Sequence, residues 1–196
     1  YIVNYFFSLN IIVEFYKNNQ MKIVISGGPG TGKSSIINKL ENLGYSVFHE
    51  SSREIIQKFK KLGHDQLFLS DPIKFSEILL QNRLNQYLES NKLKNNCSFF
   101  DRGIPDILAY LNYKKIDYSK DFNNYAAKHK YDIIFITEPW EKIYKKDQER
   151  YESFKDLVEI NKHIKEMYMK LGYKLIILPN KSINERVEFI LDKINE

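Results

Sequence analysis

An unbroken glycine-rich motif at Gly27–Ser34 constrains the fold of this chain more than any other feature. The segment reads GGPGTGKS and fits the pattern G-x-x-x-x-G-K-[ST]. It follows the apolar run Lys22–Ser26, which predicts a strand, and precedes Ser35–Asn42, which has a helical pattern. A strand, a glycine turn and a helix in this order surround an anion with backbone N–H groups at the positive end of the helix. The motif therefore predicts a nucleotide-phosphate site.

Two side chains of the motif have predicted chemical roles beyond backbone binding. Lys33 is expected to reach the β- and γ-phosphates, and the Ser34 hydroxyl is expected to ligate Mg²⁺. The alternative is a glycine-rich turn with an exposed lysine, and the flanking strand and helix argue against it. The predicted nucleotide-binding residues are Gly27, Gly28, Pro29, Gly30, Thr31, Gly32, Lys33, Ser34 and Ser35.

Short apolar runs alternate with longer amphipathic stretches along the chain from Met21 onward. Asp71-Pro72 and the pair Ser182 and Glu185 are helix-start signals, and Gly44 and Gly172 stand where helix C-terminal glycines belong. Strands that alternate with helices of this length indicate an α/β domain with a parallel sheet covered on both faces. The predicted strands are Lys22–Ser26, Ser46–Phe48, Ser98–Phe100, Asp132–Thr137 and Lys174–Leu178.

Charged residues follow the second and third predicted strands, where a parallel sheet binds its ligands. Asp101 comes directly after an apolar run, in the position of a Walker-B-type carboxylate that holds Mg²⁺ or its water. Glu50 is the best candidate for a general base or for binding a hydroxyl group, and a charge favoured by a helix N-terminus is its alternative. Both carboxylates are open candidates for the base.

Arginines stand beside these carboxylates. Arg102 follows Asp101 where a helicase or AAA⁺ motor would carry a glutamate, and an arginine there suits clamping of a substrate or phosphate. Arg53 is either part of the site or an exposed helix residue, and Asp106 is equally well explained as an ordinary helix-start charge. After the fourth strand, Arg150 lies in a mixed-charge stretch that is interpreted as a lid carrying a cation over the transferring phosphate.

The basic composition first suggests nucleic acid as a partner, with a net charge of +5 and a pI near 9.0. Only five of the 30 basic residues are arginines, however, and Arg53, Arg102 and Arg150 all fall at predicted strand-end or lid positions. We therefore expect a small anionic ligand and no nucleic acid. The sequence offers no membrane span or zinc-ligand spacing, and the single cysteine, Cys97, is expected in the core, so the protein is predicted to be cytoplasmic.

Residues 1–20 differ from the remainder, because the first methionine is Met21 and it directly precedes the first strand. We expect residues 1–20 to be an extension outside the core and residues 21–196 to form a single domain. A helix docked on the domain is the competing interpretation for the extension.

Four segments together resemble the NadR-like family of P-loop ATPases and kinases, which includes a ribosylnicotinamide kinase domain and a light-receptor translocation protein. The segments are IVISGGPGTGKSS, GYSVFHESSREII, FFDRGIPDILAY and YDIIFITEPWEKIYKKDQERYESF. The resemblance covers about Met21 to Ile194. It implies a three-layer, nucleoside-kinase-like P-loop fold with a five-stranded parallel sheet in the order 2-3-1-4-5, and ATP as the nucleotide. It also implies that Asp101 serves Mg²⁺ or the acceptor and that Arg150 belongs to the lid.

A small-molecule kinase is the leading functional hypothesis. ATP and Mg²⁺ would occupy the motif, the hydroxyl of a nucleoside-like acceptor would lie near Glu50 and Asp101, and Arg102 and Arg150 would offset the phosphoryl charge. An ATP- or GTP-binding regulatory protein or switch is the alternative. The guanine-specific form is disfavoured because Ile183 stands where an N-K-x-D motif needs aspartate.

Overall fold

The computed structural model describes residues 20–61, 67–144 and 153–196. Five strands pair in parallel to form one sheet in the order β2-β3-β1-β4-β5, which confirms the predicted order. Each observed strand matches a predicted one to within one residue at either end. The strands are β1 (Met21–Gly27), β2 (Ser46–Phe48), β3 (Cys97–Asp101), β4 (Ile133–Thr137) and β5 (Leu175–Leu178).

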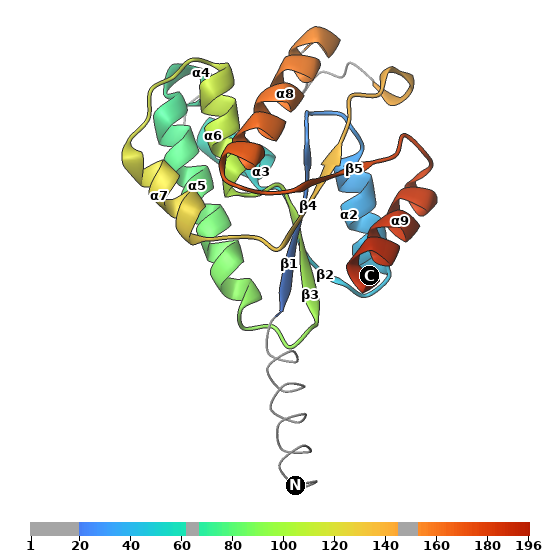
Figure 1. The fold of residues 1–196 in the computed structure, drawn as a ribbon. Helices are drawn as coiled ribbons and strands as arrows, with labels where there is room; N and C mark the ends of the chain where they lie inside the picture. Colours follow the sequence, from blue (N-terminus) through green and yellow to red (C-terminus); the bar gives the residue numbers. More distant parts are fainter. Residues whose placement is uncertain (1–19, 62–66, 145–152) are drawn as a thin grey trace, which may run out of the picture.

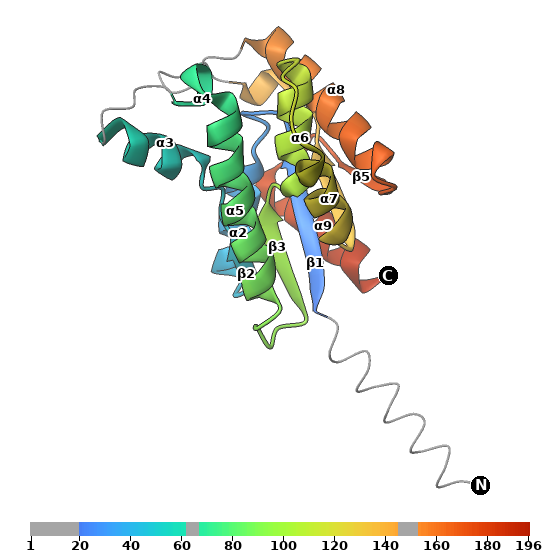
Figure 2. The same cartoon turned by 90° about the vertical axis from the view of Figure 1, so that its left-hand side faces the viewer.

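Helices cover both faces of this sheet and make it the middle of three layers (Figure 1). α2 and α9 lie on one face, and α5, α6, α7 and α8 lie on the other (Figure 2). Within the described ranges, no helix is both long enough and apolar enough to cross a membrane. The helices are α2 (Lys33–Asn42), α3 (Ser52–Lys61), α4 (Leu67–Ser70), α5 (Pro72–Ser90), α6 (Ile104–Tyr113), α7 (Lys120–Lys128), α8 (Phe154–Lys170) and α9 (Ile183–Asn195), with a 3₁₀ turn η1 (Glu141–Ile143).

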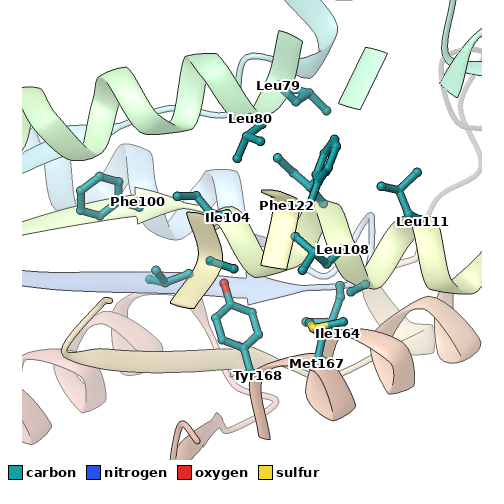
Figure 3. Packing of buried hydrophobic residues seen from close by; sticks show 14 of the residues in the cluster. Leu79, Leu80, Phe100, Ile104, Leu108, Leu111, Phe122, Ile164, Met167 and Tyr168 are labelled. Atoms are coloured by element: carbon teal, nitrogen blue, oxygen red, sulfur yellow. The ribbon is translucent and has the colours of Figure 1, made fainter. Parts of the chain in front are cut away.

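The apolar strands are buried on both faces because their alternate side chains enter two separate cores. In β1, Ile23 and Ile25 pack toward α2 and α9, whereas Val24 packs into the larger core on the opposite face. Figure 3 shows side chains of the larger core, which come from α5, β3, α6, α7 and α8. Tyr168 of α8 belongs to this core and is fully buried.

Local signals set the ends of several helices as predicted. Asp71 accepts a hydrogen bond from the Lys74 N–H and caps α5, and Ser182 forms a capping box with Glu185 at the start of α9. One boundary differs, because α2 begins at Lys33, two residues earlier than predicted. Lys33 and Ser34 therefore belong to the first turn of α2, where backbone N–H groups have no partner within the helix.

The topology brings the predicted site residues to one edge of the sheet. The glycine-rich motif follows β1, Glu50 follows β2, and Asp101 ends β3. β3 pairs directly with β1, and Asp101 is in register with Ile25. The carboxyl ends of neighbouring parallel strands thus meet beside the motif, as the sequence predicts.

Candidate functional site

The backbone of the glycine-rich loop is shaped by positions that only glycine fills easily. Gly27 has φ +138°, and a Cβ at this position would overlap Thr137 at the end of β4. Gly32 has φ +88° and forms the N-cap of α2 without a capping side chain. The first N–H groups of α2 therefore lack a side-chain acceptor, which leaves them suited to bind an anion.

Lys33 lies inside the loop with only 5% of its surface exposed. Its ammonium group donates to the Gly28 carbonyl at 2.6 Å and lies 3.4 Å from the Thr31 hydroxyl. Burial and the neighbouring Arg102 charge together lower the pKa of Lys33 to about 7, despite the opposing effect of nearby carboxylates. Both hydrogen-bond acceptors of the Lys33 amino group are neutral oxygens, so a phosphate in the loop would be a stronger partner.

Ser34 and Asp101, the two predicted Mg²⁺ ligands, lie within hydrogen-bond distance of each other. The Ser34 hydroxyl donates to Asp101 Oδ2 at 3.2 Å, and the second carboxylate oxygen, Oδ1, is buried without a hydrogen-bond partner. Burial raises the pKa of Asp101 although the Lys33 charge opposes this shift. A hydroxyl and an unsatisfied carboxylate oxygen fit Mg²⁺, which takes few protein ligands and completes its shell with water and phosphate oxygens. Among the described residues, no group of three or more His, Cys, Asp or Glu side chains could hold a metal ion.

Glu50 and Arg102 form the centre of a charged cluster beside the loop. Arg102 Nε donates to Glu50 Oε2 at 2.5 Å, and Arg83 Nη2 donates to Glu50 Oε1 at 3.4 Å. Burial raises the pKa of Glu50, but the two guanidinium groups outweigh it and lower the pKa below its ordinary value. Glu50 is therefore an ionised hydrogen-bond acceptor at neutral pH.

Arg102 adopts a backbone conformation that is rare for a residue with a side chain. Its φ is +74°, which costs about 1–3 kcal/mol and persists only where surrounding contacts fix it. Those contacts are visible, because Nη1 donates to the Gly27 carbonyl at 3.0 Å and to Asp106 Oδ1 at 3.1 Å. Arg102 thus connects the end of β3 with the phosphate loop.

Asp106 is more than the ordinary helix-start charge that the sequence left open. It stands in the first turn of α6, yet only 4% of its surface is exposed. Burial raises its pKa, but Arg102 and Arg83 outweigh that effect and hold the pKa below its ordinary value. Besides Arg102, its carboxylate accepts hydrogen bonds from the Ser26 hydroxyl at 2.5 Å, the Gly103 N–H at 2.9 Å and the Tyr168 hydroxyl at 2.7 Å.

Two residues of the site were not identified from the sequence. Arg83 lies in the middle of α5, is 6% exposed, and donates to the Gly103 carbonyl at 2.6 Å as well as to Glu50. Asn161 of α8 accepts the Gly28 N–H at 2.9 Å and donates to Glu138 at 2.8 Å. The scarcity of arginine could have drawn attention to Arg83, whereas no sequence signal marks Asn161.

Three further predictions concern Arg53, Arg150 and Cys97. Arg53 is exposed on α3, in agreement with the alternative that it is a helix surface residue. Arg150 lies outside the described residues, so its role as a lid cation stays a prediction. Cys97 is buried in the core, as expected.

Comparisons with known proteins agree with this fold. A family model described as AAA domain matches residues 22–186. No curated protein sequence matches the chain. Among solved structures, deoxyadenosine kinase from M. mycoides, with the products dCMP and dCDP bound, has a TM-score of 0.64 at 21% identity. The alignment covers 89% of this chain and 99% of that one.

Two other solved structures are similar to a comparable degree. Thymidylate kinase from Ehrlichia chaffeensis has a TM-score of 0.60 at 18% identity, and the alignment covers 90% of this chain and 99% of that one. The NadR protein in complex with NR has a TM-score of 0.66 at 16% identity. That alignment covers 92% of this chain but only 51% of NadR, so the chain spans about half of that protein. At these identities the similarity establishes the fold alone, which this chain shares with the deoxyadenosine and thymidylate kinases.

Proposed function

This chain belongs to the AAA domain family of P-loop proteins, and we propose that it is an ATP-dependent kinase of a small nucleoside-like molecule. One observation carries the proposal. The charged cluster of Glu50, Arg83 and Arg102 lies beside the phosphate loop, on the side of β2 and β3, and both carboxylate oxygens of Glu50 accept hydrogen bonds from the arginines. Such a cluster suits a second substrate, which a simple ATPase does not need.

In this proposal the phosphate loop binds and orients the nucleotide. The loop N–H groups surround the phosphates, and Lys33 exchanges its contact with the Gly28 carbonyl for phosphate oxygens. Ser34 and Asp101 would hold Mg²⁺, which neutralises charge on the phosphates when it is bound. The structural neighbours support nucleotide binding, since one is a complex with dATP and another a complex with AMP-PNP.

The acceptor would bind on the other side of the loop, with its hydroxyl against Glu50. The hydroxyl oxygen attacks the γ-phosphorus, the bond to the β–γ bridging oxygen breaks, and ADP leaves with that electron pair. Glu50 accepts the hydroxyl proton, and the Arg102 guanidinium offsets charge on the transferring group. Arg150 would contribute a further cation from the lid.

ATP turnover with and without a panel of nucleosides, nicotinamide riboside included, tests the function. We expect at least one nucleoside to accelerate ADP release well above the rate with water alone. If ATP binds and no nucleoside changes the rate of ADP release, the regulatory nucleotide-binding alternative is favoured and the kinase proposal is wrong.

Replacing Glu50 with glutamine separates acceptor chemistry from nucleotide binding. Acceptor-dependent turnover should fall by about 10²-fold, because the amide cannot accept the proton. The dissociation constant for ATP should stay within about twofold of wild type, since Glu50 lies outside the loop. Parallel measurements of steady-state turnover and ATP titration check both expectations, and an equal loss in both would contradict the assigned role.

Nucleotide binding at pH 8 should take up a proton, because the pKa of Lys33 is about 7 without an anion. Phosphate oxygens favour the charged ammonium and raise this pKa, so uncharged Lys33 gains a proton on binding. Calorimetric titration with Mg·ATP in two buffers of different ionisation enthalpy should give an uptake approaching one proton. The Lys33→Arg variant, which stays charged throughout, should show none, and the same uptake in both proteins would contradict this account.

A further inference from the structure

Arg186 of α9 is a buried arginine whose hydrogen-bonding capacity is only partly used. It is 2% exposed, and Nη1 donates to the Thr31 carbonyl at 3.2 Å. The other two donor nitrogens, Nε and Nη2, are buried without a hydrogen-bond partner. These two nitrogens form one edge of the planar guanidinium, which is the edge that binds carboxylate or phosphate in a bidentate manner.

No charge in the described parts of the chain compensates this cation. None of the ion pairs among those residues includes Arg186, and burial alone lowers its pKa. A buried guanidinium without an anionic partner is strongly unfavourable. Such an unsatisfied group in a folded protein calls for an explanation, and a ligand that supplies the missing acceptors is one.

The position of Arg186 indicates which part of a ligand it would meet. A Cβ on Gly32 would lie 3.1 Å from Arg186 Nη1, so the guanidinium lies directly against the C-terminal end of the phosphate loop. Arg102 contacts the other end of the loop, at the Gly27 carbonyl, from the side of β3. The two arginines therefore lie on opposite sides of the loop. Arg102 lies toward β3 and β2, and Arg186 lies toward β4 and β5.

The acceptor cluster occupies the side of β2 and β3, so the γ-phosphate must point there for transfer. The nucleoside end of ATP then leaves the loop on the opposite side, toward Arg186. We propose that the free edge of Arg186 binds the α-phosphate, the phosphate next to the ribose. This inference rests on the proposed function, because it requires ATP in the loop.

A purely structural role, in which Arg186 only holds the Thr31 carbonyl, makes a different prediction. Loss of that contact would weaken the binding of all nucleotides by one common factor. Direct contact with the α-phosphate instead makes binding sensitive to sulfur at that phosphate, because sulfur is a weak hydrogen-bond acceptor. Combining the Arg186 substitution with the replacement of oxygen by sulfur in the ligand isolates the interaction between Arg186 and the α-phosphate.

The test compares the dissociation constants of ATP, both diastereomers of ATPαS, and ATPγS for wild type and Arg186→Gln. Wild type should bind one ATPαS diastereomer about threefold or more weaker than ATP. Arg186→Gln should weaken ATP binding by about 10- to 100-fold and abolish the discrimination between ATP and ATPαS. Replacing a γ-phosphate oxygen with sulfur, as in ATPγS, should change the dissociation constant by the same factor in both proteins. Arg186→Lys, which keeps the charge but not the bidentate edge, should fall between them. Lys193→Gln, in the last turn of the same helix, should match wild type.

The outcomes separate this inference from the proposed function. The α-thio effect is the ratio of the dissociation constants of ATPαS and ATP. If this ratio is the same in wild type and Arg186→Gln, or if it is one in wild type, the role of Arg186 is overturned and the kinase proposal stands. If wild type does not bind ATP at all, both are wrong. Where the glutamine variant fails to fold, Arg186→Lys supplies the comparison, and an α-thio effect as large as in wild type then overturns the role of Arg186.

Discussion

Replacing Lys33 with alanine is expected to remove the thermal stabilisation that Mg·ATP gives the wild-type protein. At about 100 times its Kd, a ligand adds about 2.7 kcal/mol to the free energy of unfolding, which raises the Tm of a domain of this size by roughly 5–10 °C. The alanine variant should show a shift near zero. Acceptor-dependent turnover should fall by about 10³-fold, since the residue supplies positive charge to the transferring phosphate.

The difference between the melting temperatures with and without nucleotide is the informative quantity. Lys33 is buried and donates only to neutral oxygens, so its removal is expected to change the melting temperature of the free protein as well. Lys39→Ala, in the last turn of the same helix, is the matched control and should keep the full ATP-dependent shift. A full shift in the Lys33 variant would contradict the assignment of the phosphate loop.

Replacing Asp106 with alanine is expected to destabilise the fold by about 3–5 kcal/mol, because it leaves buried partners without their shared acceptor. The groups that lose it are the Arg102 guanidinium, the Ser26 and Tyr168 hydroxyls and the Gly103 N–H. Urea unfolding measures the loss. Asp121→Ala, which removes an exposed acid from the first turn of α7, is the control and should cost less than about 1 kcal/mol.

The effect of Asp106→Ala should also depend on pH. The folded-state pKa of Asp106 lies below its ordinary value, so its ionised form contributes stability above the ordinary pKa of 3.8. That contribution is lost as the pH falls through the folded-state pKa. The difference between wild type and Asp106→Ala should therefore be largest at neutral pH and shrink in acid. A loss as small as that of Asp121→Ala, or one that is independent of pH, would contradict the network.

The sequence was sufficient for the parts of the structure that depend on local patterns. The motif at Gly27–Ser34 predicted the strand, turn and helix around it, because glycine placement and apolar runs act over a few residues. Glu50 and Asp101 were predicted to lie beside the motif because they follow strands, and the carboxyl ends of parallel strands meet at one edge. The sheet order came from the family resemblance rather than from the residues themselves.

What the sequence left out depends on contacts between distant elements. Asp106 looks like any acid in a first helical turn until α8 brings the Tyr168 hydroxyl and β1 the Ser26 hydroxyl to it. Arg83 and Arg186 lie within amphipathic helices, where an arginine ordinarily faces water. Their burial follows from the packing of α5 and α9, which no local pattern specifies.

The fate of the γ-phosphate tests the central claim of phosphoryl transfer most directly. Wild-type protein is incubated with Mg²⁺, ATP radiolabelled at the γ-phosphate, and the nucleoside that most accelerates ADP release. We expect most of the label in the phosphorylated nucleoside, and Glu50→Gln should reduce that product by about 10²-fold. Label that appears only as inorganic phosphate, at a rate independent of the nucleoside, would contradict the kinase account.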